Sequence, residues 1–190
     1  MKRREARARG ADAVTERAKN LVWWGAVVAY GTFLPYARRF WTVLFGRRSP
    51  WFSRTPLILS AILVLVVFWI LLRRKERRAT VYAAIVVISF LYCYLFRIVT
   101  LPIERIHMGE YGILTFFIVM ALAGHARGNI LYLWAVIMAF HIGIIDELVQ
   151  GFIAGRYYDL QDVWLNAYAC GLGGCVVAFI IRPGRVACER

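Results

Sequence analysis

Long apolar runs separated by short charged connections dominate the hydrophobic pattern of this chain. The clearest runs cover residues 56–72, 79–96, 111–124, 130–145 and 163–181. They approach the roughly 17 to 25 apolar residues that a membrane-spanning helix needs. No strand-like alternation of apolar and polar positions accompanies them, so a barrel is not expected. The pattern predicts an all-α fold, a polytopic transmembrane helical bundle.

A further apolar run, residues 21–37, leaves the expected number of spans at five or six. Its two adjacent tryptophans suit a membrane interface, while Gly31 and Pro35 weaken a straight helix. The run is either a first span or an interfacial helix that follows a charged surface helix. We favour six spans, because the short basic connection RRKERR, residues 73–78, then lies inside together with a cytoplasmic N-terminus.

Composition and charge agree with a protein of the cell membrane. The 190 residues are 61% hydrophobic and only 18% charged, against about 25% charged in ordinary soluble domains. The net charge of +13 comes from Lys and Arg residues at the ends of apolar runs, which suits topology signals and anionic headgroups. An arginine and aromatic mixture at residues 38–54 is expected to lie on headgroups. The expected partner is the lipid bilayer, and no nucleic acid is expected.

Two polar clusters interrupt the apolar pattern. One is ERIHMGEYG, residues 104–112, where His107 and Glu110 are three apart and share one side of a helix. The other is residues 146–166, between the last two apolar runs. Two spans separate the clusters, so both must open on the same side of the membrane. Charges at a helix centre in the bilayer cost about 2.5 to 3.5 kcal/mol each, which makes such groups functional candidates.

The second cluster combines acids and amides with one arginine. Asp146 and Gln150 are one helical turn apart, and so are Asp162 and Asn166. Repulsion among the acids would be compensated either by a cation or by Arg156, which would bridge Asp146, Glu147 or Asp162 and hold a re-entrant loop together. The candidate ligand-binding residues are His107, Glu110, Asp146, Glu147, Gln150, Arg156, Asp162 and Asn166.

Metal and haem sites are weaker interpretations of the same residue types. The His and acid side chains of the clusters suit a metal ion, but no HExxH-type spacing fixes them, so no metal site is predicted. His125 and His141 are potential haem ligands, yet a lone histidine in a spanning helix is more often a hydrogen-bonded structural residue. The cofactor is left unassigned.

These motifs resemble those of the VanZ-like family of small integral membrane proteins. The resemblance rests on HMGEYG, then DELVQGFIAGR, and then DVWLN with a glycine-rich helix. It covers about residues 80–181, and all eight candidate residues match its pattern, whereas Ala154 and Ala169 depart from it. The implied organisation is a basic N-terminal extension at 1–79 with one or two membrane segments, a four-helix membrane domain at 80–181, and a short tail at 182–190.

The resemblance implies a protein of the cell envelope and, for the founding member, antibiotic resistance through tolerance of a glycopeptide. It implies no established reaction, so whether the chain is an enzyme stays open. We expect the cluster to bind a polar lipid headgroup or a lipid-linked or glycopeptide cell-wall precursor, with Arg156 contacting an anionic group. The alternative is a non-catalytic accessory subunit of a larger membrane complex, docking through its N-terminal spans.

Overall fold

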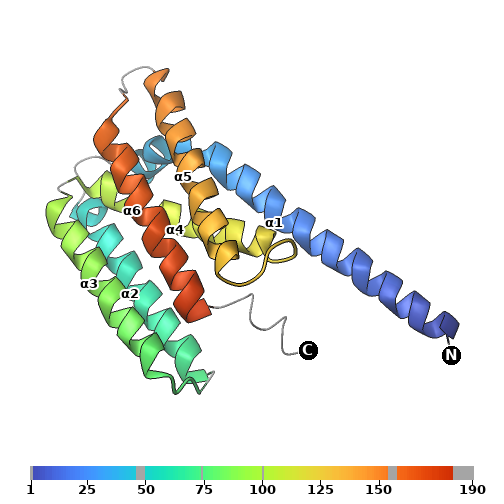
Figure 1. Cartoon of the computed structure of the whole chain (residues 1–190). Coiled ribbons are helices and arrows are strands. Elements are labelled where there is room, and N and C mark those ends of the chain that lie inside the picture. Colours follow the sequence, from blue (N-terminus) through green and yellow to red (C-terminus); the bar gives the residue numbers. More distant parts are fainter. Residues whose placement is uncertain (1, 46–49, 74, 100, 154–157, 182–190) are drawn as a thin grey trace.

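The computed structural model describes residues 2–45, 50–73, 75–99, 101–153 and 158–181, which are almost entirely helical (Figure 1). No strand occurs among these residues, so the prediction of an all-α fold is confirmed. The helices are α1 (Lys2–Phe45), α2 (Pro50–Arg73), α3 (Ala79–Ile98), α4 (Pro102–Leu122), α5 (Asn129–Gly151) and α6 (Leu160–Val176), followed by the π-helical turn η1 (Val177–Ile181).

Four helical segments are long and apolar enough to cross a membrane, which supports a multi-pass membrane protein. They are Ala79–Ile98, Glu104–Leu122, Asn129–Gly151 and Leu160–Ile181. In α2 only the shorter stretch Ser60–Arg73 is comparably apolar. The described residues therefore give four candidate spans, fewer than the five or six expected from the sequence.

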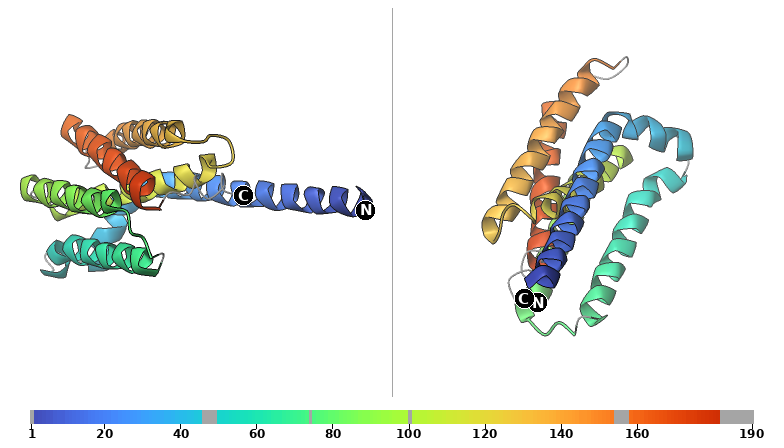
Figure 2. Two further views of the ribbon diagram at one scale, coloured as in Figure 1. Left: turned by 60° about the horizontal axis from the view of Figure 1, so that its bottom comes forward. Right: turned by 90° about the vertical axis from the view of Figure 1, so that its right-hand side faces the viewer.

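The first helix is longer than the sequence pattern suggested. We expected a charged surface helix and then a separate segment from residue 21, but α1 is one helix of 44 residues. Pro35 lies inside it, and Figure 2 shows α1 changing direction in its C-terminal part, as a proline that removes a backbone hydrogen bond produces. The N-terminal half projects from the bundle (Figure 1). Val27 and Leu34, farther along, are buried in the core.

The core is centred on α4, which packs against α1, α5 and α6. The buried positions of α5 and α6 include several small residues, such as Ala135, Ala139 and Ala169, which allow the helices to approach closely. A smaller cluster joins α2 and α3 to η1 through Leu71, Val81, Ile88 and Ile180.

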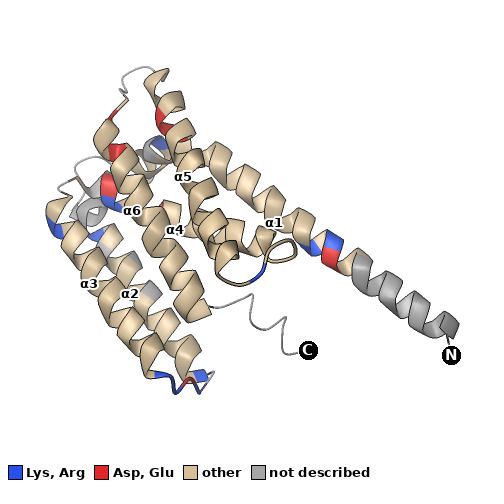
Figure 3. Ribbon diagram, viewed as in Figure 1, with Lys and Arg blue, Asp and Glu red and all other residues tan. Residues whose placement is uncertain are grey.

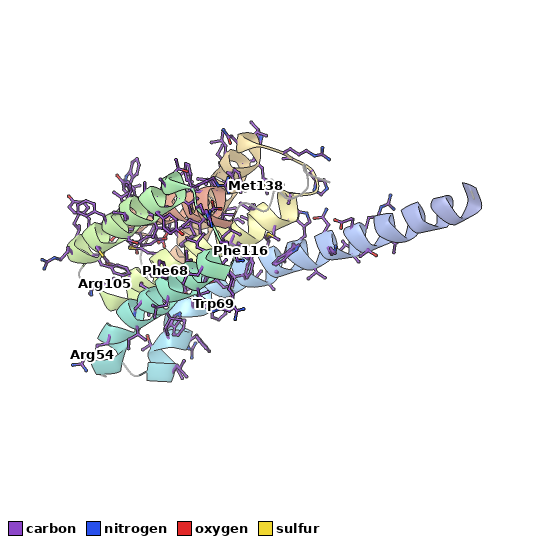
Figure 4. The ribbon with its side chains drawn as sticks, turned by 90° about the horizontal axis from the view of Figure 1, so that it is seen from below. Arg54, Phe68, Trp69, Arg105, Phe116 and Met138 are labelled. Atoms are coloured by element: carbon purple, nitrogen blue, oxygen red, sulfur yellow. The ribbon has the colours of Figure 1, made fainter. Side chains whose placement is uncertain are left out.

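Large apolar side chains also cover the outer faces of the helices. Phe68 and Trp69 of α2, both labelled in Figure 4, expose 49% and 57% of their surface. Phe116 of α4, labelled in the same figure, instead packs edge-on against Trp23 of α1, with ring centroids 5.9 Å apart. The outward apolar faces suit contact with lipid rather than water.

The backbones of α4 and α6 approach each other closely where they cross. A Cβ atom on Gly173 would lie 2.7 Å from Cα of Gly112, a backbone atom that cannot rotate away. Glycine at this crossing is therefore required by the separation of the two helices.

The Gly173→Ala variant is expected to lose about 1–3 kcal/mol of unfolding free energy, because its methyl group pushes α4 and α6 apart. The measurement is unfolding in detergent followed by circular dichroism. Gly171→Ala, in the same helix, is the control, since a Cβ there meets no atom within 4 Å. Equal stability of the two variants would contradict the close crossing.

Candidate functional site

Acidic side chains gather at one end of the bundle, where α4 and α6 begin and α5 ends (Figure 3). The basic connection between α2 and α3 lies at the opposite end (Figure 3). A hydrogen bond between Tyr111 and Asp146 joins the two polar clusters directly. The two clusters therefore lie together at one end of the bundle, and the side of the membrane on which they open stays a prediction.

Asp146 of α5 lies at the centre of this site. Its Oδ2 accepts a hydrogen bond of 2.6 Å from the Tyr111 hydroxyl of α4 and one of 2.7 Å from Nε2 of Gln150. All three side chains are buried, and the spacing of one helical turn explains why Gln150 reaches Asp146. Oδ1 of Asp146 has no hydrogen-bond partner among the described residues, although the residue is only 3% exposed. The described residues therefore leave this buried acceptor unused.

Glu110 organises the neighbouring part of the site. Its Oε1 accepts a 2.8 Å hydrogen bond from Nε1 of Trp41, which lies in the C-terminal part of α1. Nδ1 of His107 lies 2.9 Å from Oε2 of Glu110. This distance suits an ion pair when the histidine is protonated, but the two atoms are not aligned for a hydrogen bond. The His107 ring is also 6.3 Å from the Tyr111 ring, so both parts of the site are contiguous.

The third helix of the site, α6, contributes Asn166. A Cβ on Gly143 of α5 would meet Cε1 of Tyr111 at 3.1 Å and Cβ of Asn166 at 3.3 Å. The absence of a side chain at Gly143 therefore lets Tyr111 and Asn166 approach α5. Asn166 is 3% exposed, and its Nδ2 donor has no partner among the described residues.

Most of the candidate residues lie inside this site. Asp162, on the first turn of α6, is only partly buried. Arg156 lies outside the described residues, so its contacts and the re-entrant loop remain predictions. The buried candidates are His107, Glu110, Asp146, Glu147, Gln150 and Asn166.

Most of the polar stretch 146–166 belongs to the C-terminal end of α5 and the N-terminal end of α6. Asp146, Glu147 and Gln150 belong to the last turns of α5. Asp159 caps α6, because its Oδ1 accepts a 2.8 Å hydrogen bond from the backbone N–H of Gln161. Asp159 thus has a local structural role.

Sequence reasoning missed two residues of the site, Trp41 and Tyr111. We expected Trp41 in a stretch that lies on headgroups, and we assigned Tyr111 to the start of an apolar run. The sequence did contain a sign of Tyr111, which follows His107 by four positions and so lies on the same helical face. No local pattern pairs Trp41 with Glu110, 69 residues later.

The histidines outside the site make hydrogen-bonding contacts. Nδ1 of His141 lies 2.7 Å from the backbone oxygen of Ile137. The ring nitrogens of His125 lie 3.3 and 3.4 Å from Nδ2 of Asn20. Within the part of the chain that the structure describes, no group of three or more His, Cys, Asp or Glu side chains is arranged to hold a metal ion.

The fold and the site define a class: a multi-pass helical membrane protein with a buried, acid-rich cluster at one end of its bundle. Comparisons with protein-family models, curated proteins and solved structures each gave no significant match. The chemistry of the cluster is the remaining guide to function. Its carboxylates are hydrogen-bond acceptors, so they complement a ligand that carries hydroxyl, amine or amide donors.

The Tyr111→Phe variant tests the bond between α4 and α5. It is expected to lose about 1–2 kcal/mol of unfolding free energy in detergent, because the Asp146 carboxylate loses a buried donor. Tyr168→Phe is the control, since Tyr168 is 57% exposed. A loss of the same size in both variants would show that the Tyr111 hydroxyl contributes nothing specific.

The contact between α1 and α4 is tested by a double-mutant cycle of Trp41→Phe and Glu110→Leu, which removes the acceptor oxygen. Each single variant is expected to lower the unfolding free energy. The double variant should lose less than their sum, by about 0.5–1.5 kcal/mol, because both remove the same hydrogen bond. Additive losses would mean that Trp41 and Glu110 do not interact energetically.

Proposed function

We propose that this chain is a VanZ-like membrane protein of the cell envelope that binds a polar lipid headgroup or a lipid-linked cell-wall precursor. The observation that carries the proposal is Oδ1 of Asp146, a buried acceptor that has no partner among the described residues and is held in place by Tyr111 and Gln150. A buried polar atom without a partner costs about 1–3 kcal/mol, and a ligand donor would remove that cost. Binding is sufficient for this function, and no reaction is assigned.

The proposed topology has six spans and a cytoplasmic N-terminus. The stretch Ser60–Arg73 and residues 21–37 within α1 supply the two spans beyond the four candidates. The basic connection at residues 73–78 then lies inside, as the positive-inside rule requires of a short loop. In this topology the polar site opens at the outer face, because it occupies the opposite end of the bundle (Figure 3).

The proposal gives the site residues distinct roles. Asp146 and Glu147 accept hydrogen bonds from hydroxyl or amide groups of the ligand. His107 and Glu110, 2.9 Å apart, form a pair that can exchange or hold a proton beside it. Arg156 is the predicted contact for a phosphate group of the ligand.

The experiment is a binding titration of the purified protein in lipid nanodiscs with a polyprenyl-diphosphate-linked disaccharide peptide. Glu147→Gln is expected to weaken binding about tenfold, because a neutral amide replaces a charged acceptor of similar shape. Glu76→Gln is the control, since Glu76 pairs with Arg78 in the connection at the far end of the bundle. Equal affinity of the two variants, with both folded, would overturn the proposal.

An accessory subunit of a larger membrane complex is the second candidate function. It is favoured by the projecting N-terminal half of α1, where Leu21 and Val22 expose 72% and 68% of their surface. This function predicts stoichiometric co-purification with other membrane proteins. It also predicts that Glu147→Gln alters abundance alone, with no effect on ligand binding.

A further inference from the structure

A groove of about 300 Å³ runs between α1 and α5 and reaches the polar site. On the α1 side it is lined by Gly31, Pro35 and Tyr36, and on the α5 side by Ile142, Ile145 and Asp146, among others. The same Asp146 carries the buried oxygen that has no hydrogen-bond partner in the described part of the chain. The groove therefore joins an apolar outer wall to the residue that carries this buried acceptor.

Two features of the residues that line the groove provide hydrogen-bond acceptors. Asp146 contributes Oδ1, since Oδ2 is already bonded to Tyr111 and Gln150. Pro35 has no N–H, so it cannot donate the usual helical hydrogen bond to the carbonyl of Gly31, and both residues line the groove. A matching ligand must carry N–H or O–H donors.

The other wall of the groove is apolar and faces outward. Ile145 is 58% exposed and Val149 is 39% exposed, and both belong to the candidate span Asn129–Gly151. Exposed apolar side chains on a spanning helix meet lipid chains. The occupant that fits both walls is an amphiphile with an alkyl chain and a donor-bearing headgroup.

We propose that this groove binds a bilayer lipid whose headgroup carries N–H or O–H donors. The alkyl chain lies along Ile142 and Ile145, and the headgroup donates a hydrogen bond to Oδ1 of Asp146. The inference rests on the proposed function, because it makes the groove the route by which that ligand reaches the polar site from the bilayer.

The test compares two lipids with identical acyl chains, phosphatidylethanolamine and phosphatidylcholine. Native mass spectrometry measures how many molecules of each lipid the purified full-length chain retains. Only the first probe has N–H donors. We expect about tenfold tighter retention of phosphatidylethanolamine, the effect of one hydrogen bond to a charged group. Asp146→Asn should remove this preference. Its amide oxygen would take the place of Oδ2 beside Tyr111 and Gln150, so its amide nitrogen, a donor, would replace the acceptor Oδ1.

Blocking the groove should release both lipids. Gly31→Leu places a side chain in the groove, where the nearest atom to a Cβ is Cγ2 of Ile142 at 3.7 Å. Gly25→Leu, on the same helix with no atom within 4 Å of its Cβ, is the control. A second pair of variants changes exposed positions on α5. Ile145→Trp blocks the groove from this helix, and Leu148→Trp, outside the groove lining, is its control. This pair keeps the test valid if Gly31→Leu misfolds.

The outcomes separate this inference from the proposed function. If the blocked variants retain phosphatidylethanolamine as the parent does, or if the two lipids bind equally to the parent, the groove is not the lipid site. If Glu147→Gln still weakens binding of the cell-wall precursor in that case, the proposed function stands without the groove. Loss of both effects would remove both proposals.

Discussion

The buried hydrogen bond from Tyr111 to Asp146 is the interaction on which the site depends. It joins α4 to α5 where both side chains are buried, so opening it would leave two polar atoms unpaired in an apolar surrounding. Gln150 bonds the same carboxylate oxygen and fixes the rotation of the Asp146 side chain. The second oxygen is consequently held in one position, and a preorganised acceptor costs a ligand little to use.

This arrangement requires unusually close helices. Gly112 and Gly173 let the backbones of α4 and α6 meet, and Gly143 leaves space beside α5 for the Tyr111 ring and Asn166. In a bilayer, association of helices depends on packing and interhelical hydrogen bonds, because lipid tails are as apolar as the side chains they would replace. The polar network therefore depends on the glycines, because its hydrogen bonds cannot form unless the helices approach closely.

Much of the site followed from the geometry of helices and membranes. Spacings of three and four residues placed His107 with Glu110 and Asp146 with Gln150, and the parity of two intervening spans brought the pairs to one side. The link from Trp41 to Glu110 could not be predicted, because it depends on how α1 packs over 69 residues of separation. The number of spans was also uncertain from the sequence, since glycine, proline and tyrosine dilute the hydropathy of residues 21–37 without interrupting the helix.

The balance of paired and unpaired groups supports the proposed binding function over a purely structural network. A structural network gains stability only when each buried polar atom finds a partner, and natural proteins leave few without one. Here Asp146 Oδ1 and Asn166 Nδ2 have none among the described residues, and they offer one acceptor and one donor in the same cluster. A hydroxyl group both donates and accepts, so one hydroxyl can satisfy either atom. A headgroup or sugar rich in hydroxyls therefore complements this site better than a simple cation, which would leave the Asn166 donor unpaired.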